Sequence, residues 1–281
     1  MEFTKLQGSG NDFIVIDNRD GRVYKLLERL GLTIKEFVSR LCAPHTGIGA
    51  DGLILIEEPQ DTENNFRWQF FNSDGSVAEM CGNGSRCAVR FAYEKGIVDK
   101  EVRFETLAGV IRAWVLEGGR RVKVQLTKPH SYRELLLEVD GRRIEGSFIN
   151  TGVPHFVAVV EDLEGLDVKR LGRAIRFHKE FEPKGTNVNF IKPLSENSIR
   201  IRTYERGVEA ETLACGTGAT ASALVAYRKG LVKAKPVEVI TRGGELLRID
   251  FDESLQEVFL EGGVCKVFEG FFTEEALTCM R

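Results

Sequence analysis

The chain has 281 residues, of which 42% are hydrophobic and 29% are charged, and its formal net charge is −3. This composition predicts a soluble globular protein with room for two domains, and it excludes a basic nucleic-acid-binding surface. No apolar run approaches the roughly 18 residues of a membrane span, and the first residues lack a signal-peptide core, so we expect no membrane partner and a cytoplasmic location.

The cysteines and histidines offer little for a metal site or a disulfide framework. The chain has six cysteines and four histidines, with no Cys-x-x-Cys pair, and a cytoplasmic protein keeps its thiols reduced. We therefore expect no zinc site and no structural disulfides. Four cysteines are predicted to be small buried or surface residues without chemistry, namely Cys42, Cys87, Cys265 and Cys279.

The first half of the chain predicts short strands and a capped helix. A strand is expected over residues 3–17, interrupted at 8–12 by the segment Gly-Ser-Gly-Asn-Asp. Thr33 and Glu36 have the spacing of a capping box and precede an apolar stripe at helical spacing, which indicates a helix. Further extended segments are expected at 53–56, 66–71, 102–109 and 122–124.

The second half repeats this order at a nearly constant spacing. Asp167 is expected to cap the counterpart of the first helix. Cys81 and Cys215 are 134 residues apart, and so are Tyr93 and Tyr227. Because unrelated sequences would not keep one spacing, we infer an internal duplication. Extended segments of this half are expected at 188–191, 199–204, 237–244 and 257–259.

The duplicated cysteines precede two Ala-rich helices. Each cysteine is followed by Gly-x-Gly, and the helices are expected at 85–95 and 219–229. A helix N-terminus carries about +0.5 of a unit charge, which lowers the pKa of a thiol there and attracts anions. Cys81 and Cys215 are therefore predicted to act as bases or nucleophiles near neutral pH. The alternative is a buried structural cysteine beside a helix-starting glycine, which the matched pair disfavours.

These patterns together predict an α+β protein of two pseudo-symmetric domains. The two cysteine helices are apolar on more than one face, which is typical of a helix enclosed by a curved, mostly antiparallel sheet or barrel. We expect the first domain at residues 1–126, completed by the C-terminal segment 263–281. The second domain is expected at 127–262.

Five longer motifs are specific in combination. They are Gly8-x-Gly10-Asn11-Asp12-Phe13, Phe71-Asn72-x-Asp74-Gly75-Ser76, Cys81-Gly82-Asn83-Gly84-x-Arg86-Cys87, Tyr204-Glu205-Arg206-Gly207 and Ala214-Cys215-Gly216-x-Gly218. Over nearly its whole length the chain resembles the diaminopimelate epimerases. That resemblance implies interconversion of LL- and meso-2,6-diaminopimelate in lysine and peptidoglycan precursor synthesis. It also implies a small amino-acid substrate, a homodimer, and catalysis without pyridoxal phosphate or metal.

The resemblance also implies individual roles. Cys81 would donate a proton and Cys215 accept one in the LL-to-meso direction, with His155 and Glu205 as further catalytic candidates. This agrees with the chemistry, since inversion needs a base and an acid on opposite faces of the α-carbon. Helix N-terminal amides can meet the charge that develops on the α-carboxylate. The residues implied to contact substrate are Asn11, Asn72, Gly82, Asn83, Asn187, Glu205, Arg206, Gly216 and Thr217.

Structural explanations are open for several of these residues. Asn11 and Asn72 lie in loops, where asparagine favours turns. Glu205 and Arg206 have the alternative of a solvated pair at a strand end. His155 has the alternative of a structural histidine in its Gly-x-Pro-His turn.

Two positions depart from the family pattern and bear on the substrate. Asp51-Gly52 stands where many members have Asp-Gln, and Gly152-Val153-Pro154-His155 stands where they have Gly-Asn-Pro-His. The lost side chains would face the substrate, so an alternative is another two-cysteine racemase or epimerase, of the hydroxyproline type. A non-catalytic anion-binding protein would not need a cysteine in both copies. A thiol redox protein would need the resolving spacing that the pair lacks.

Overall fold

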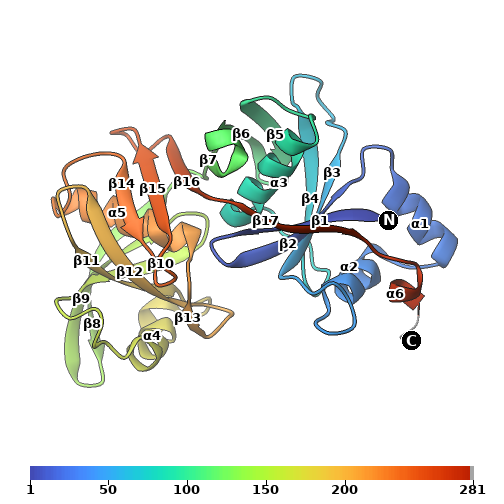
Figure 1. The fold of residues 1–281 in the computed structure, drawn as a ribbon. Coiled ribbons are helices and arrows are strands. Elements are labelled where there is room, and N and C mark those ends of the chain that lie inside the picture. Colours follow the sequence, from blue (N-terminus) through green and yellow to red (C-terminus); the bar gives the residue numbers. More distant parts are fainter. Residues whose placement is uncertain (279–281) are drawn as a thin grey trace. The chain divides into compact units, whose positions relative to one another are not determined.

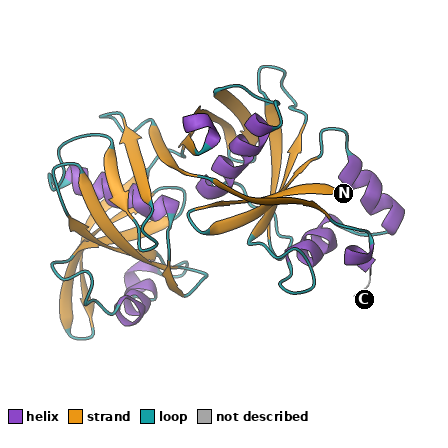
Figure 2. Ribbon diagram, in the orientation of Figure 1, coloured by secondary structure: helices purple, strands orange, loops and turns teal. Residues whose placement is uncertain are grey.

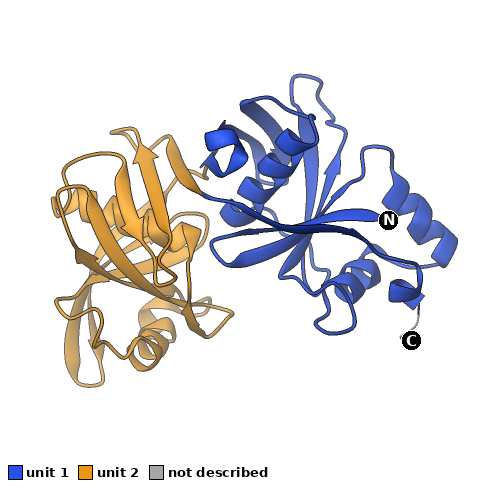
Figure 3. Cartoon of the chain, in the orientation of Figure 1, with its two compact units in different colours: residues 1–124, 263–281 blue, residues 125–262 orange. Residues whose placement is uncertain are grey.

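The computed structural model describes residues 1–278 (Figures 1 and 2). Cys279, which was predicted to carry no chemistry, lies outside the described residues. Contacts divide the chain into two compact units, one formed by residues 1–124 with the segment from 263 onward and the other by residues 125–262 (Figure 3). Each unit combines a sheet with helices, so the predicted α+β class is confirmed.

Unit 1 contains a mostly antiparallel sheet in which the C-terminal strand pairs with the N-terminal one. Its strands pair in the order β17-β1-β2-β3-β4-β5-β6-β7, with β2–β3 and β4–β5 parallel and the antiparallel pairs elsewhere. The strands are β1 (Glu2–Gly8), β2 (Asn11–Asp17), β3 (Gly52–Glu57), β4 (Phe66–Asn72), β5 (Glu101–Thr106), β6 (Gly109–Leu116), β7 (Arg121–Gln125) and β17 (Cys265–Phe271).

Unit 2 repeats the same succession of parallel and antiparallel pairs. Its strands pair in the order β8-β9-β10-β11-β12-β14-β15-β16, with β10–β11 and β12–β14 parallel and β13 added antiparallel to β12. The strands are β8 (His130–Val139), β9 (Arg142–Asn150), β10 (Pro154–Val159), β11 (Asn187–Pro193), β12 (Ser198–Glu205), β13 (Ala210–Thr212), β14 (Val237–Ile240), β15 (Leu246–Phe251) and β16 (Val258–Gly263). The duplication read from the spacing is thus a duplication of sheet topology.

One helix in each unit is enclosed by its sheet, as predicted. Helix α3 (Gly82–Glu94) contacts β1, β2, β3 and β6, and helix α5 (Gly216–Arg228) contacts β9, β10, β11, β12, β14 and β15. Alanine side chains let the strands approach α5, and Ala219, Ala221, Ala223 and Ala226 are all fully buried. Close approach on all sides explains why these helices lack a polar face.

The remaining helices cover the outer faces of the sheets. The predicted capping box is present at α2 (Ile34–Cys42), where the Glu36 amide donates to Thr33 Oγ1 at 3.2 Å and the Thr33 amide donates to Glu36 Oε2 at 2.8 Å. Asp167 caps α4 (Val168–Arg176) by accepting from the Arg170 amide at 3.0 Å. The sequence reasoning missed α1 (Arg22–Leu30), α6 (Glu275–Thr278) and the 3₁₀ turns η1 (Glu117–Gly119) and η2 (Lys179–Phe181).

Two predicted boundaries were wrong for local reasons. The break expected at 8–12 is a two-residue turn, because Ser9 and Gly10 both have positive φ angles of 60° and 79°, the geometry of a tight hairpin. Asn11 and Asp12 therefore belong to β2. The cysteine helices begin three residues earlier than expected, at Gly82 and Gly216, since the cysteine itself is the N-cap.

Candidate active site

Each unit places one cysteine at the N-cap of its enclosed helix. The amide of Gly84 donates to Cys81 Sγ at 3.4 Å, and the amide of Gly218 donates to Cys215 Sγ at the same distance. The next two residues of each helix, Gly82 with Asn83 and Gly216 with Thr217, occupy first-turn positions whose N–H groups have no intrahelical acceptor. Both predicted half-sites thus combine a sulfur with outward-facing amides and the positive end of a helix.

The second glycine of each Gly-x-Gly has a different environment in the two units. A Cβ atom at Gly84 would lie 3.4 Å from its nearest neighbours, the side chains of Ile54 and Trp68, which is an ordinary contact. A Cβ atom at Gly218 would lie 2.4 Å from Asn189 Oδ1 and 3.2 Å from Cys215 Sγ. Glycine is therefore required for close approach at 218 but not at 84.

In unit 1, Asn11 lies beside Cys81. The Asn11 Oδ1 atom is 3.8 Å from Cys81 Sγ, and Asn11 Nδ2 donates to Asp51 Oδ2 at 2.7 Å. Asp51 Oδ2 also accepts from the Asp12 amide at 3.1 Å. Asp51 was not among the predicted site residues, although it stood in the quoted Asp-Gly pair. It orients the Asn11 amide so that the oxygen faces the sulfur.

A buried guanidinium joins the β1–β2 turn to the first turn of α3. Arg86 is fully buried, and its Nη2 atom donates to Ser9 Oγ at 2.6 Å and to Asn83 Oδ1 at 3.0 Å. Its Nη1 atom donates to the Gly82 carbonyl at 3.2 Å. The Asn83 side chain is thus directed at Arg86, which leaves its backbone amide as its candidate contact. In unit 2 the corresponding carbonyl, that of Gly216, accepts from Thr220 Oγ1 at 2.9 Å.

Asn72 and Gly52 pair across β4 and β3 in unit 1. Asn72 is exposed and its Nδ2 atom donates to Ser76 Oγ at 3.0 Å, within the loop that follows β4. At Gly52 a Cβ atom would lie 2.6 Å from the Phe71 carbonyl oxygen and 2.9 Å from the Phe70 ring. A side chain at Gly52 would require β4 to shift.

In unit 2 a carboxyl group lies beside the sulfur. Thr212 Oγ1 donates to Glu205 Oε1 at 2.7 Å, and Glu205 is also hydrogen-bonded to Cys215. Cys215 Sγ lies 3.5 Å from Thr217 Oγ1. Glu205 is half-buried beside the sulfur, so it is not one member of a solvated surface pair. Its burial raises the pKa of the carboxyl.

The predicted lowering of the thiol pKa was wrong for Cys215. Burial raises the pKa of the Cys215 thiol, and the negative charge of Glu205 raises it further. The hydrogen bonds from Thr217 and the Gly218 amide act in the opposite direction but are smaller. Burial and the neighbouring carboxylate therefore outweigh these two hydrogen bonds in setting the pKa of the Cys215 thiol.

Asn187 and Arg206 are held together through the backbone. Asn187 Oδ1 accepts from the Arg206 amide at 2.8 Å, and Asn187 Nδ2 donates to the Pro154 carbonyl at 3.2 Å. The Arg206 guanidinium donates to the Lys184 carbonyl at 3.3 Å and lines a pocket of about 410 Å³ together with Val153. Arg133, Lys184 and Arg206 make that pocket suitable for an anionic group, although Glu180 and Glu182 also line it.

His155 is fully buried on β10, next to Asn187 in the parallel pairing of β10 with β11. Its Nδ1 atom lies 3.1 Å from Asn189 Nδ2. Burial lowers the pKa of His155 to about 3, and the charge of Arg206 acts in the same direction. Asn189 was not predicted from the sequence. A polar residue inside the apolar run 188–191 was the signal that could have identified it.

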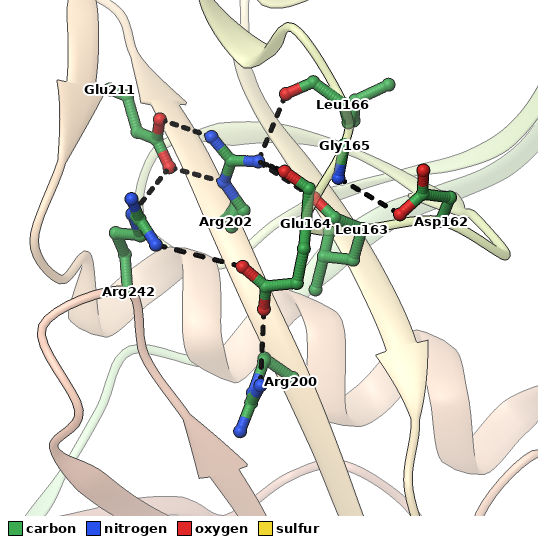
Figure 4. Close-up of polar contacts among 9 residues, drawn as sticks. All are labelled: Asp162, Leu163, Glu164, Gly165, Leu166, Arg200, Arg202, Glu211 and Arg242. Atoms are coloured by element: carbon green, nitrogen blue, oxygen red, sulfur yellow. Dashed lines mark hydrogen bonds and ion pairs between the residues drawn. The ribbon is translucent and has the colours of Figure 1, made fainter.

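A polar network holds the strand that precedes Cys215 (Figure 4). Arg202 forms a bidentate pair with Glu211 at 2.7 and 2.8 Å, and its Nη1 atom donates to the Leu163 carbonyl at 2.8 Å. Arg242 approaches the same carboxylate at 3.7 Å. Glu211 is followed by Thr212, the donor to Glu205, so the network fixes the strand that positions this carboxyl.

The other described cysteines lie in the interior or on the surface, as expected. Cys42 and Cys87 are buried in α2 and α3, and Cys265 is exposed on β17. Burial raises the pKa of Cys42 to about 12. Among residues 1–278 no group of three or more His, Cys, Asp or Glu side chains is placed to hold a metal ion. The described helices include none long and apolar enough to cross a membrane.

Comparisons with known proteins agree with one another. The sequence profile of the family described as Diaminopimelate epimerase matches residues 3–131 and 147–267. A diaminopimelate epimerase of Aquifex aeolicus is 68% identical over 277 residues, covering 99% of both chains.

Two solved structures share the fold at low sequence identity. A PhzF-family phenazine biosynthesis protein of Bacillus anthracis has a TM-score of 0.70 at 15% identity, covering 97% of this chain and 99% of its own. A hydroxyproline epimerase of Agrobacterium vitis has a TM-score of 0.64 at 16% identity, covering 96% and 91%. The structural neighbours establish the fold alone, whereas the profile and the sequence relative establish more: this chain belongs to the diaminopimelate epimerase family.

Proposed function

We propose that the protein is a diaminopimelate epimerase that interconverts LL- and meso-2,6-diaminopimelate, in lysine and peptidoglycan precursor synthesis. The observation that carries this proposal is the full-length identity of 68% to a diaminopimelate epimerase, together with a cysteine at the N-cap of the enclosed helix in each half. The hydroxyproline epimerase, at 16% identity, shares the fold and carries no argument about the substrate.

In the proposed reaction each cysteine serves one face of the substrate α-carbon. In the LL-to-meso direction Cys215 removes the α-proton and Cys81 delivers a proton to the opposite face. Removal of the proton places negative charge on the α-carboxylate, which the amides of Gly82, Asn83, Gly216 and Thr217 can stabilise as preorganised donors. Neither step needs a cofactor, because thiol and thiolate supply the acid and the base.

Glu205 supplies a way to form the Cys215 thiolate. The carboxyl and the thiol are adjacent, so ionisation of either one disfavours ionisation of the other. The raised pKa of Glu205 makes it a better proton acceptor than an ordinary carboxylate. We propose that Glu205 accepts the thiol proton when LL substrate binds, and that Asn11 is the corresponding hydrogen-bond partner of Cys81.

Substrate identity is tested by α-deuteration. With purified protein in D₂O we expect LL-diaminopimelate to gain deuterium at one α-carbon as the meso isomer accumulates, while trans-4-hydroxy-L-proline stays unlabelled. Both are followed by NMR under the same conditions. Labelling of hydroxyproline alone would replace the proposed activity with the alternative one. Labelling of neither compound would refute both.

We further propose that units 1 and 2 are the two expected domains and that the active form is a cytoplasmic homodimer. An exposed apolar edge strand supports dimerisation: on β17 the exposed fractions of Val267 and Phe271 are 55% and 78%, and within the described part of the chain β17 pairs only with β1. Exposed apolar side chains on an unpaired strand edge are suited to burial against a second copy of the chain. Cell fractionation tests the location, and recovery in a membrane or secreted fraction would contradict it.

The Phe271→Glu variant tests the dimer. We expect it to sediment as a monomer at concentrations where the unchanged protein sediments as a dimer, because a charge would be buried at the interface. Leu107→Glu, at a position 65% exposed in the same unit, is the matched control and should leave the dimer intact. A monomeric unchanged protein, or equal behaviour of the two variants, would exclude β17 as the interface.

A further inference from the structure

The two ring nitrogens of the buried His155 have different surroundings. Nδ1 lies 3.1 Å from Asn189 Nδ2. Nε2 is buried and has no hydrogen-bond partner within residues 1–278. A buried polar group without a partner costs about 1–3 kcal/mol, so its presence requires an explanation.

The orientation of the Asn189 amide decides which nitrogen of His155 carries the proton. The Phe156 carbonyl oxygen, which can only accept, lies 3.2 Å from Asn189 Nδ2. On the other side Thr203 Oγ1 donates to Asn189 Oδ1 at 3.0 Å. If the amide were turned over, Asn189 Oδ1 would face the Phe156 carbonyl oxygen, and two acceptors would repel each other. The amino group of Asn189 therefore faces both Phe156 and His155.

It follows that His155 Nδ1 is a hydrogen-bond acceptor. An amide N–H can only donate, so Nδ1 must offer a lone pair, and a neutral ring then has its hydrogen on Nε2. The low pKa of His155 keeps the ring neutral throughout the neutral pH range. A ring in this state cannot act as a base through Nδ1, which is occupied, or through Nε2, which is protonated.

We propose that Asn189 is a positioning residue that fixes His155 as the Nε2–H tautomer, and that His155 donates this hydrogen to a carboxylate oxygen of the bound amino acid. The second half of the proposal rests on the proposed function. Its location supports it, because His155 pairs with Asn187 across β10 and β11, the backbone amide of Arg206 donates to Asn187, and the charge of the Arg206 side chain acts on the His155 ring. An anionic oxygen is the acceptor that both a neutral N–H and a nearby guanidinium favour.

The tautomer is measured directly in the unchanged protein. Protein labelled with ¹⁵N-histidine is examined by two-bond ¹H–¹⁵N NMR, and His155 is assigned by the signal that disappears in His155→Gln. We expect a pyrrole-type Nε2 and a pyridine-type Nδ1, unchanged across the neutral pH range. A protonated Nδ1, or an imidazolium at neutral pH, would overturn the assignment.

Two variants distinguish the effect of the Asn189 donor group from that of a general change in packing. Asn189→Asp replaces the donor with an acceptor, so we expect the hydrogen of His155 to move to Nδ1. Thr203→Val is the matched control, since it removes the bond to Oδ1 but leaves the Phe156 carbonyl to orient the amide, and the tautomer should stay. The role of Asn189 is refuted if the tautomer is the same in Asn189→Asp, or if it changes in Thr203→Val.

Titration with substrate tests separately whether His155 donates a hydrogen bond to the bound amino acid. On titration with LL-diaminopimelate we expect the Nε2 proton resonance to move downfield as the N–H finds an acceptor. If other resonances of the protein titrate while this one does not, His155 is not the donor. If no resonance titrates, diaminopimelate is not the ligand, which overturns the proposed function and this half with it. The tautomer result is independent of both.

Discussion

Epimerisation of diaminopimelate should fall by at least about 10²–10⁴-fold when either Cys81 or Cys215 is replaced with serine. Serine is itself a good N-cap, so the hydrogen bond from Gly84 or Gly218 and the start of the helix should survive. A hydroxyl group, however, ionises far less readily than a thiol and cannot exchange protons with the α-carbon. The loss therefore reports acid–base chemistry and not the loss of a helix cap.

The control for both variants is Cys265→Ser. This cysteine is exposed on β17 and has no role in the proposed reaction, so kcat and KM should stay near those of the unchanged protein. Initial rates are measured in both directions by resolving the two isomers chromatographically. A serine variant that retains full activity in either direction would remove that cysteine from the mechanism.

The second large effect is expected at the two pseudo-equivalent glycines. Gly218→Ala places a methyl group 2.4 Å from Asn189 Oδ1, an atom fixed by its bond to Thr203. Relief requires the Asn189 amide or the first turn of α5 to move, and overpacking of this kind costs about 1–3 kcal/mol of unfolding free energy. Because the Cys215 sulfur is also within 3.2 Å, activity should fall together with stability.

Gly84→Ala is the matched substitution in the other half. Its methyl group meets neighbours at 3.4 Å, and alanine is a better helix former than glycine by up to about 1 kcal/mol. We therefore expect unchanged or higher stability in urea unfolding and an active enzyme. Equal losses in the two variants would show that the contact with Asn189 is not what requires glycine at 218.

Topology was predictable because it is encoded in repeated local patterns. The 134-residue spacing of the cysteine loops identified the duplication, and the apolar surface of the Ala-rich helices identified them as enclosed. Thr33 and Asp167 cap their helices as expected because an N-cap depends only on residues three apart. The sequence gives no comparable local rule for α1, whose N-cap Gly21 makes no side-chain hydrogen bond.

The properties of the candidate site depend on contacts between distant residues and were less predictable. Arg86 binds Ser9, 77 positions away, and Asn189 binds His155, 34 positions away. The pKa of Cys215 was predicted in the wrong direction because the sequence shows the helix start but not the burial or the neighbouring Glu205. These hydrogen bonds and pKa shifts depend on distances between residues that are far apart in the chain. The spacing of motifs along the sequence does not give those distances.

The central claim, one cysteine for each face of the α-carbon, is tested most directly by stereospecific proton exchange in D₂O. Cys215→Ala removes the base for the LL isomer but leaves Cys81 able to remove and return the proton at the D-centre of the meso isomer. We expect NMR to show slow deuterium uptake by meso substrate without inversion, and none by the LL isomer. Cys81→Ala should show the mirror pattern, with exchange confined to the LL isomer. Undiminished epimerisation by either variant, or exchange of both isomers by one, would contradict the two-cysteine mechanism.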